Sequence, residues 1–147
     1  QFVQAFERIE KKYQMPVIIS THPRTRNKMQ EFGVDVKNQR IQFMDPFGFF
    51  DFVHLERNAF CVLSDSGTVQ EECSIFKIPN VTLRDVTERP ETIECGSNVL
   101  SGAEVETIMT CVKQVVSRNS DWNPPQEYVA TSVTRTVANI LTGYHHR

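Results

Sequence analysis

Hydrophobic and polar positions alternate along the chain with two different periods. Near the start, Phe2, Phe6, Ile9 and Tyr13 recur at helical spacing, which predicts an amphipathic helix. Short apolar or β-branched runs bounded by turn residues predict strands, since such runs suit a buried sheet. These strands are expected at residues 15–20, 40–44, 59–64, 80–83 and 98–100.

Helical patterns separate the strands. They fall at residues 21–32, where a turn leads into the helix, and at 45–58, 66–77, 90–95, 103–117 and 127–141. Strands that alternate with helices favour βαβ units, and therefore a parallel sheet with helices on both faces. The apolar run "AFCVL" indicates a strand buried on both sides. We predict one Rossmann-like α/β domain over residues 1–147, a length that suits a single core.

Composition and charge narrow the class of protein. The apolar share of 39% and the charged share of 23% are those of an ordinary globular domain. A net charge of −2 with mixed signs argues against nucleic acid as a partner. No apolar run approaches the roughly 18 residues that a membrane-spanning helix needs, and no secretory signal pattern opens the chain. We therefore expect a cytoplasmic protein with no membrane partner.

The cysteines and the two ends of the chain carry no motif. The four cysteines are widely spaced and form no CxxC pair, so we expect buried thiols, no metal ion and no cofactor. The chain opens without Met inside a helical pattern, and we expect Gln1 to be a cut point in a longer protein. At the other end, His145 and His146 are expected to belong to a frayed tail.

The segment "SDSGTVQEE" directly follows the apolar run and opens a predicted helix. In a parallel α/β sheet, ligands bind beyond the carboxyl ends of the strands. Ser66 can cap the helix, while Gly67 and Thr68 offer free backbone amides to a diphosphate. Glu72 lies one turn in, where a carboxylate can accept hydrogen bonds from ribose hydroxyls. An ordinary helix cap explains the same residues, so the local pattern leaves both interpretations open.

Three further segments carry candidate binding residues. In "RDVTERPE", Arg84 or Arg89 can clamp a phosphate, or the charges can form an ion-paired surface loop. The aromatic residues of segment 43–52 can stack on a base, although aromatics at helical spacing usually belong to the core. His22 follows a predicted strand, where it is either an anion contact or a turn residue.

Taken together, residues 64–102 resemble the signature region of the non-hydrolysing UDP-N-acetylglucosamine 2-epimerases. The blocks SDSG-x-x-QEE and R-D-x-T-E-R-P-E are both present at the separation found in that family. "DPFGFFDFVHL" and "THPR" also fall where the family has similar segments. The resemblance implies a GT-B architecture of two Rossmann-like halves, of which this chain is the C-terminal, UDP-binding half. The N-terminal domain, with the acid and base carboxylates, and the catalytic histidine loop would lie upstream of Gln1.

The resemblance also implies a reaction and a set of site residues. The family interconverts UDP-N-acetylglucosamine and UDP-N-acetylmannosamine by eliminating UDP to a 2-acetamidoglucal and adding it back, usually as a homodimer. The catalytic residues would lie outside this chain, which alone is expected to be inactive. By position, Ser66 and the amides of Gly67 and Thr68 would bind the diphosphate, and Glu72 would bind the ribose hydroxyls. Arg89 would contact the phosphate or sugar side of the ligand, and Phe52 would lie against the uracil. His22 matches a family position near a regulatory nucleotide-sugar site.

Two departures from the family pattern leave the sugar specificity open. Thr68 replaces a glycine that is common in the first block, and Phe47 stands where some members have a polar residue. The alternatives are a hydrolysing 2-epimerase, an epimerase of another UDP-linked 2-acetamido sugar, and a non-catalytic UDP-sugar binding module.

Overall fold

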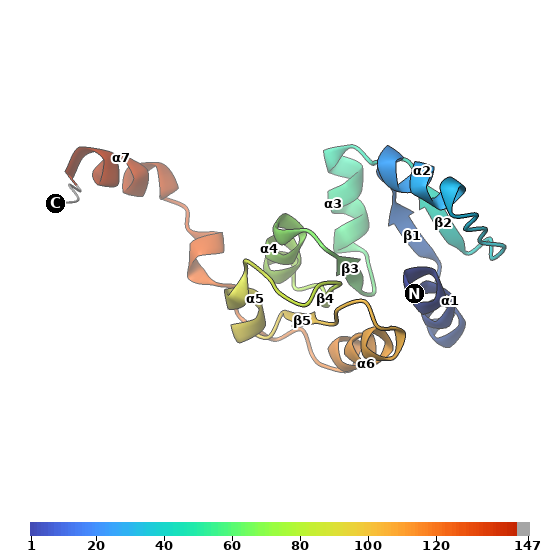
Figure 1. Cartoon of the computed structure of the whole chain (residues 1–147). Helices are drawn as coiled ribbons and strands as arrows, with labels where there is room; N and C mark the ends of the chain where they lie inside the picture. Colours follow the sequence, from blue (N-terminus) through green and yellow to red (C-terminus); the bar gives the residue numbers. More distant parts are fainter. Residues whose placement is uncertain (144–147) are drawn as a thin grey trace.

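The computed structural model describes residues 1–143 (Figure 1), so the tail expected at His145 and His146 lies outside the described residues. The helices are α1 (Phe2–Tyr13), α2 (Pro23–Glu31), α3 (Phe49–Arg57), α4 (Gly67–Phe76), α5 (Pro90–Glu94), α6 (Val105–Val116) and α7 (Val133–Gly143), with a 3-10 turn η1 (Gln126–Val129). The strands are β1 (Val17–Ser20), β2 (Ile41–Met44), β3 (Val62–Ser64), β4 (Asn80–Thr82) and β5 (Asn98–Leu100). The predicted alternation of strands and helices is therefore confirmed.

Every ladder between strands is parallel, as predicted. β1 pairs with β2, and β4 lies between β3 and β5. Over the part of the chain that the structure describes, no ladder joins β1 to β3, so the strands form a two-stranded and a three-stranded part rather than one continuous sheet. Helix α1 connects the two parts, because it packs on β1 and β2 and also on α6.

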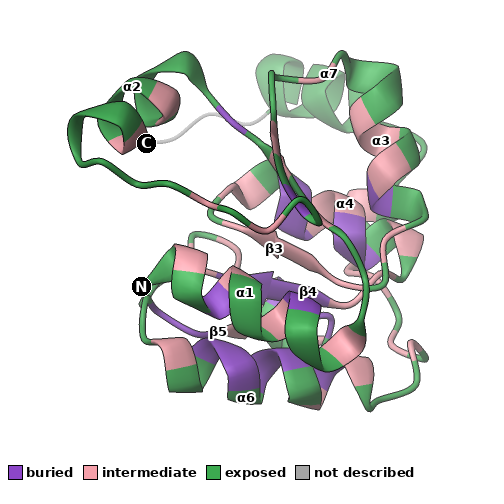
Figure 2. Ribbon diagram, turned by 90° about the vertical axis from the view of Figure 1, so that its right-hand side faces the viewer, coloured by how far each residue is buried: buried purple, intermediate pink, exposed green. Residues whose placement is uncertain are grey.

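The core lies where α1 and α6 cover one face of the three-stranded part, while α3 and α4 lie on the other side (Figure 2). On α6, Ile108, Val112 and Val115 recur at helical spacing and are buried against Val81 of β4 and Ala5 of α1. An apolar stripe of this kind is typical of a helix that packs one face on a core.

The expectation that "AFCVL" forms a strand buried on both sides is wrong. Only Val62–Ser64 is extended, and all three residues are half-buried. β3 pairs with β4 alone and lies at the edge of its part of the sheet, which leaves it less covered than a central strand. Phe60 stays 44% exposed and packs on Tyr13, with 5.4 Å between the ring centroids.

The aromatic residues of segment 43–52 do not form a common core. Phe49 and Phe50 are 68% and 85% exposed and contact each other edge to face. They lie in the first turn of α3, whereas the face of α3 that is covered carries Phe52 and Glu56, four residues apart. The core interpretation is therefore wrong for Phe49 and Phe50, and Phe52 is half-buried.

The helix predicted at 127–141 is broken into two pieces. Ala130 is extended, with φ −64° and ψ 124°, and separates η1 from α7. The Tyr128 hydroxyl donates a hydrogen bond to the Glu91 carboxylate, which holds η1 beside α5, while α7 projects away from the rest of the molecule (Figure 1). Among the helices of residues 1–143, none is long and apolar enough to cross a membrane.

Candidate functional site

The two motif blocks lie at the same edge of the three-stranded part of the sheet. The first block follows β3, the second follows β4, and the loop after β5 lies beside them. The Leu83 amide donates to the Ser64 carbonyl at 3.0 Å, and the Ser101 amide donates to the Thr82 carbonyl at 3.0 Å. Because the strands are parallel, their carboxyl ends bring these loops together, as the sequence predicted.

Helix α4 begins without a side-chain cap. Ser66 occupies the N-cap position, but its side chain makes no capping hydrogen bond within residues 1–143, so this part of the cap interpretation is wrong. The Ser66 amide donates instead to the Ser64 hydroxyl at 3.0 Å, which fixes the turn into the helix. The first amides of a helix have no partner inside it, so those of Gly67 and Thr68 are available together with the positive end of the helix dipole.

Arg89 lies over the start of α4. Its guanidinium carbon is 3.7 Å from the place that a Cβ on Gly67 would occupy, so the glycine and the arginine are in contact across the two motif blocks. Arg89 Nε also forms an ion pair with Glu71 of α4. The hydrogen bond to Glu71 raises the pKa of the Arg89 guanidinium, which keeps the side chain cationic.

Arg84 takes the surface alternative that the sequence left open for both arginines. Its Nη1 lies 3.8 Å from a carboxylate oxygen of Glu88 in the same loop. Both side chains of this pair are more exposed than those of the Arg89 pair. The structure therefore separates the two arginines: Arg89 faces the helix start, and Arg84 lies in an ion-paired surface loop.

A buried hydrogen-bond network fixes the loop that carries Arg89. Gln70, only 1% exposed, accepts hydrogen bonds from the Thr87 hydroxyl at 2.6 Å and from Asn98 Nδ2 at 3.1 Å. Thr87 in turn accepts from the Arg89 amide at 3.0 Å. On the other side of the loop, the Thr92 hydroxyl donates to the Arg89 carbonyl at 2.7 Å. The backbone of Arg89 is thus held on both sides.

Sequence reasoning missed the role of this network. Gln70 is part of the quoted "QEE" block, and Thr87 and Thr92 lie in or beside the second block. In the sequence these polar residues stand beside charged residues, and their spacing does not mark them as buried. Polar residues that are buried must find hydrogen-bond partners, but which partners they find depends on the packing of α4 against the second loop.

Glu72 and Phe52 lie on neighbouring helices. α3 packs on α4. The charge of Glu72 on α4 contributes to the raised pKa of Glu56, which lies one turn after Phe52 on α3. Burial is the main cause that raises the pKa of Glu72 itself. The contact between the two helices therefore brings the face of α3 that carries Phe52 toward the side of α4 that carries Glu72.

His22 lies on the other part of the sheet, after β1, and begins α2. Its Nδ1 accepts a hydrogen bond from the Arg24 amide at 3.2 Å, so His22 caps this helix. Ser66, Glu72 and Arg89 all follow strands of the three-stranded part. The structure thus brings the two motif blocks together, whereas His22 follows a strand of the two-stranded part.

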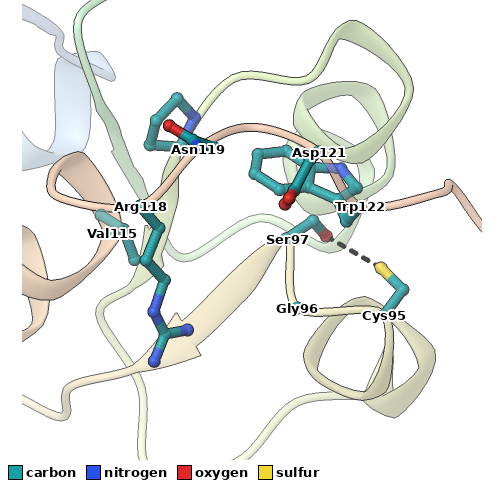
Figure 3. Close-up of a pocket in the computed structure, with 9 residues that line it drawn as sticks. Cys95, Gly96, Ser97, Val115, Arg118, Asn119, Asp121 and Trp122 are labelled. Atoms are coloured by element: carbon teal, nitrogen blue, oxygen red, sulfur yellow. Dashed lines mark hydrogen bonds between the residues drawn. The ribbon is translucent and has the colours of Figure 1, made fainter.

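A hollow of about 380 Å³ lies at the opposite edge of the sheet (Figure 3). Its lining includes Pro79 and Ser97, which precede β4 and β5, and the side chains of Arg118 and Trp122. Trp122 Nε1 donates to the Ser74 carbonyl at 3.0 Å, which fixes the indole at the rim. Because the motif blocks lie at the carboxyl ends of these strands, this hollow is separate from the candidate site.

Comparisons with known proteins identify the family. The family model described as UDP-N-acetylglucosamine 2-epimerase matches residues 1–142. A curated relative of that name from Methanococcus maripaludis is 42% identical over 146 residues, which cover 97% of this chain and 39% of the relative. The solved Methanocaldococcus jannaschii UDP-GlcNAc 2-epimerase in complex with UDP-GlcNAc and UDP matches with a TM-score of 0.87 and 37% identity, covering 96% of this chain and 39% of that one.

A third relative acts on a different sugar by its name. The Pseudomonas aeruginosa UDP-2,3-diacetamido-2,3-dideoxy-D-glucuronate 2-epimerase is 40% identical over 94 residues, which cover 64% of this chain and 26% of the relative. The chain spans 39% of the length of the M. maripaludis relative and 39% of the M. jannaschii epimerase. Since the match extends over nearly all of its residues, the chain belongs to the UDP-N-acetylglucosamine 2-epimerase family.

Proposed function

We propose that the chain is the UDP-binding, C-terminal half of an enzyme that interconverts UDP-N-acetylglucosamine and UDP-N-acetylmannosamine. One observation carries the proposal: Arg89 of the second motif block lies over the uncapped start of α4, which the first block forms. A cation and free helix amides at one point suit a diphosphate. The match to an epimerase solved with UDP-GlcNAc and UDP supports the same ligand class.

Each predicted site residue has a role in this proposal. The Ser66 hydroxyl and the amides of Gly67 and Thr68 hold the diphosphate, and Arg89 neutralises its charge. Glu72 accepts hydrogen bonds from the ribose hydroxyls, and Phe52 lies against the uracil. His22, which follows a strand of the two-stranded part, belongs to a separate regulatory nucleotide-sugar site.

The proposed site serves both halves of the reaction. UDP leaves the sugar in the elimination step and attacks the anomeric carbon in the addition step, so charge develops on the diphosphate and is then consumed. Fixed donors that do not have to reorganise stabilise such charge better than water does. The buried bonds of Thr87 and Thr92 to the backbone of Arg89 supply that fixity.

The remainder of the enzyme is part of the same proposal. The acid and base carboxylates come from an N-terminal domain outside this chain, and the intact enzyme is a homodimer. A cytoplasmic location fits the four free thiols, which suit a reducing compartment. The 147-residue chain alone is expected to bind UDP weakly and to show no turnover, and epimerisation by this chain would contradict the division of roles.

A second candidate substrate is another UDP-linked 2-acetamido sugar, and Thr68 is the residue that favours it. A side chain at the helix start takes space that a glycine would leave to the ligand, and the P. aeruginosa relative acts on a diacetamido uronate by its name. Product analysis of the full-length protein by NMR distinguishes the candidates. Formation of UDP-N-acetylmannosamine from UDP-N-acetylglucosamine supports the epimerase that interconverts these two sugars. No exchange at C2 of UDP-N-acetylglucosamine supports an epimerase of another sugar or a binding module. Release of free N-acetylmannosamine and UDP supports a hydrolysing enzyme.

The binding site is tested by calorimetric titration of UDP against variants of the full-length protein. We expect Arg89→Ala and Glu72→Ala each to weaken binding by about tenfold or more, because a hydrogen bond to a charged group contributes about 1.5–3 kcal/mol. Arg84→Ala is the matched control, since Arg84 lies in the same loop but pairs with Glu88 at the surface. Equal affinities for wild type, Arg89→Ala and Glu72→Ala would refute the proposed site.

A further inference from the structure

Glu56 is a buried acid on α3 with no evident role in the fold. Its residue is 3% exposed, and neither carboxyl oxygen receives a hydrogen bond from any residue between 1 and 143. None of the ion pairs formed by Lys and Arg in this region includes it. A carboxylate buried without a donor or a cation is strongly unfavourable, so the state of this group needs an explanation.

The groups of α4 that interact with Glu56 are the Glu72 carboxyl and the Cys73 thiol, while the neighbouring Arg57 guanidinium stacks on the Phe76 ring of α4. Glu72 faces Glu56 from α4 and is half-buried, while Glu71 of the same helix acts on Glu72. The buried thiol of Cys73 also faces Glu56 from α4. Two ionised carboxyl groups have no donor between them and repel each other, whereas one proton turns the contact into a hydrogen bond. The arrangement therefore requires a proton on one member of the pair.

The more deeply buried member holds the proton. Burial, together with the charge of Glu72, raises the pKa of Glu56 to about 7. The hydrogen bond from Glu56 acts on Glu72 in the opposite sense and lowers its pKa, against the effect of burial. Because Glu56 is more deeply buried than Glu72, its carboxyl is the one that stays neutral and can donate, and Glu72 is the ionised acceptor.

We propose that Glu56 is a positioning residue whose neutral carboxyl donates a hydrogen bond to the Glu72 carboxylate and orients it toward the ribose of the ligand. The inference rests on the proposed function, because it takes Glu72 as the ribose contact. One oxygen of Glu72 accepts from Glu56, which leaves the other oxygen and the remaining lone pairs for the ribose hydroxyls. Glu56 itself does not touch the ligand.

Discrimination between UDP and its 2′,3′-dideoxyribose analogue measures the ribose contact directly. In the wild-type full-length protein, we expect UDP to bind more tightly than the analogue at pH 6.5. The ratio of the two affinities should fall as the pH rises through about 7, because ionised Glu56 repels Glu72. Since both ligands carry the same diphosphate, its titration cancels in the ratio. The affinities are measured by calorimetry at pH 6.5 and 8.5.

Two substitutions at one position separate orientation from simple packing. Glu56→Gln keeps a donor without a titrating proton, so the ratio should stay close to the wild-type value at pH 6.5 and no longer change with pH. Glu56→Leu keeps the volume but removes the donor, so the ratio should fall by about tenfold at pH 6.5 while the affinity for the analogue is unchanged. Thermal unfolding of each variant confirms that it is folded.

The possible failures are distinguishable. A wild-type protein that binds UDP and prefers it to the analogue, while Glu56→Leu keeps the same preference, overturns the role of Glu56 and leaves the proposed function intact. Equal loss of affinity for both ligands in Glu56→Leu also overturns it, because a structural defect would act on both. A wild-type protein that does not bind UDP overturns the proposed function and this inference together.

Discussion

At the scale of single residues, the loop that follows β5 is held against the second motif block by a glycine. Gly102 has a φ of +62°, and its amide donates to the Arg84 carbonyl at 3.1 Å. A Cβ on Gly102 would lie 2.6 Å from a carboxylate oxygen of Asp85. Both the backbone conformation and the space therefore favour glycine at this position.

We expect Gly102→Ala to lower the free energy of unfolding by about 2–3 kcal/mol, because it combines left-handed backbone strain with a steric contact. Gly33→Ala is the matched control: its φ is +60°, and a Cβ there would meet no atom within 4 Å. It should cost only the backbone term, about 1 kcal/mol. Urea denaturation measures both, and equal losses would show that Asp85 moves aside without cost.

At the scale of helices and strands, the sequence predicted the elements that local residue patterns determine. The helical pattern over residues 103–117 predicted α6, and turn residues at the ends of short apolar runs predicted the strands. Contacts between distant segments determined the rest: the hydrogen bond from Tyr128 to Glu91 holds η1 and lets the chain break at Ala130. No local pattern contains that information.

The candidate site also combines features that the sequence predicted with features that it did not. The paired motif blocks and the strand order predicted that Ser66 and Arg89 share an edge, because parallel strands end together. The absence of a cap on Ser66 within the described residues, the bonds of Gln70 and the contact between Glu56 and Glu72 all depend on how α4 packs against its neighbours. Residue spacing along the chain does not encode these contacts.

The packing of α3 on α4 makes stability depend on pH. The pKa of Glu56 rises from 4.5 to about 7 on folding, so the folded protein keeps a proton that the unfolded chain releases. Ionisation therefore opposes folding, and we expect the free energy of unfolding to contain a contribution that is complete below pH 4.5 and is lost as the pH rises to about 7.

Urea denaturation between pH 5 and 8 measures this contribution without any ligand. Glu56→Gln should remove that part of the pH dependence, because the amide does not titrate. Glu7→Gln, at an exposed position on α1, should leave it in place. Parallel pH curves for wild type and Glu56→Gln would show that Glu56 ionises normally in the folded protein.

At the scale of the whole molecule, α7 stands apart with an apolar stripe on one side. Its exposed apolar residues recur at helical spacing and are 47–78% exposed; they are Val133, Val137, Ile140 and Leu141. An exposed apolar surface of this kind usually has a partner. In the proposed enzyme that partner is the N-terminal domain, since the chain spans about 39% of its relatives.

We expect the 147-residue chain to self-associate at high concentration through this stripe. A Val137→Glu, Ile140→Glu double variant should stay monomeric at the same concentration, because charge on the stripe opposes its burial. Sedimentation velocity over a concentration series measures the effect. Ile75→Glu, at an exposed apolar position on α4, is the control and should associate as strongly as the wild type. Loss of association in this control but not in the double variant would show that the contact does not involve α7.

The register of the three-stranded part has a consequence for the order of folding. The bond from Asn80 to the Val62 carbonyl and the ion pair between Glu71 and Arg89 each span 18 residues of sequence, whereas the pair that fastens α1 to α6, Arg8 with Glu106, spans 98. Contacts between residues close in sequence form faster than distant ones, because less chain entropy is lost in closing them. We therefore expect the sheet edge and its ion pair to assemble before α1 docks on α6, an order that φ-value analysis would test.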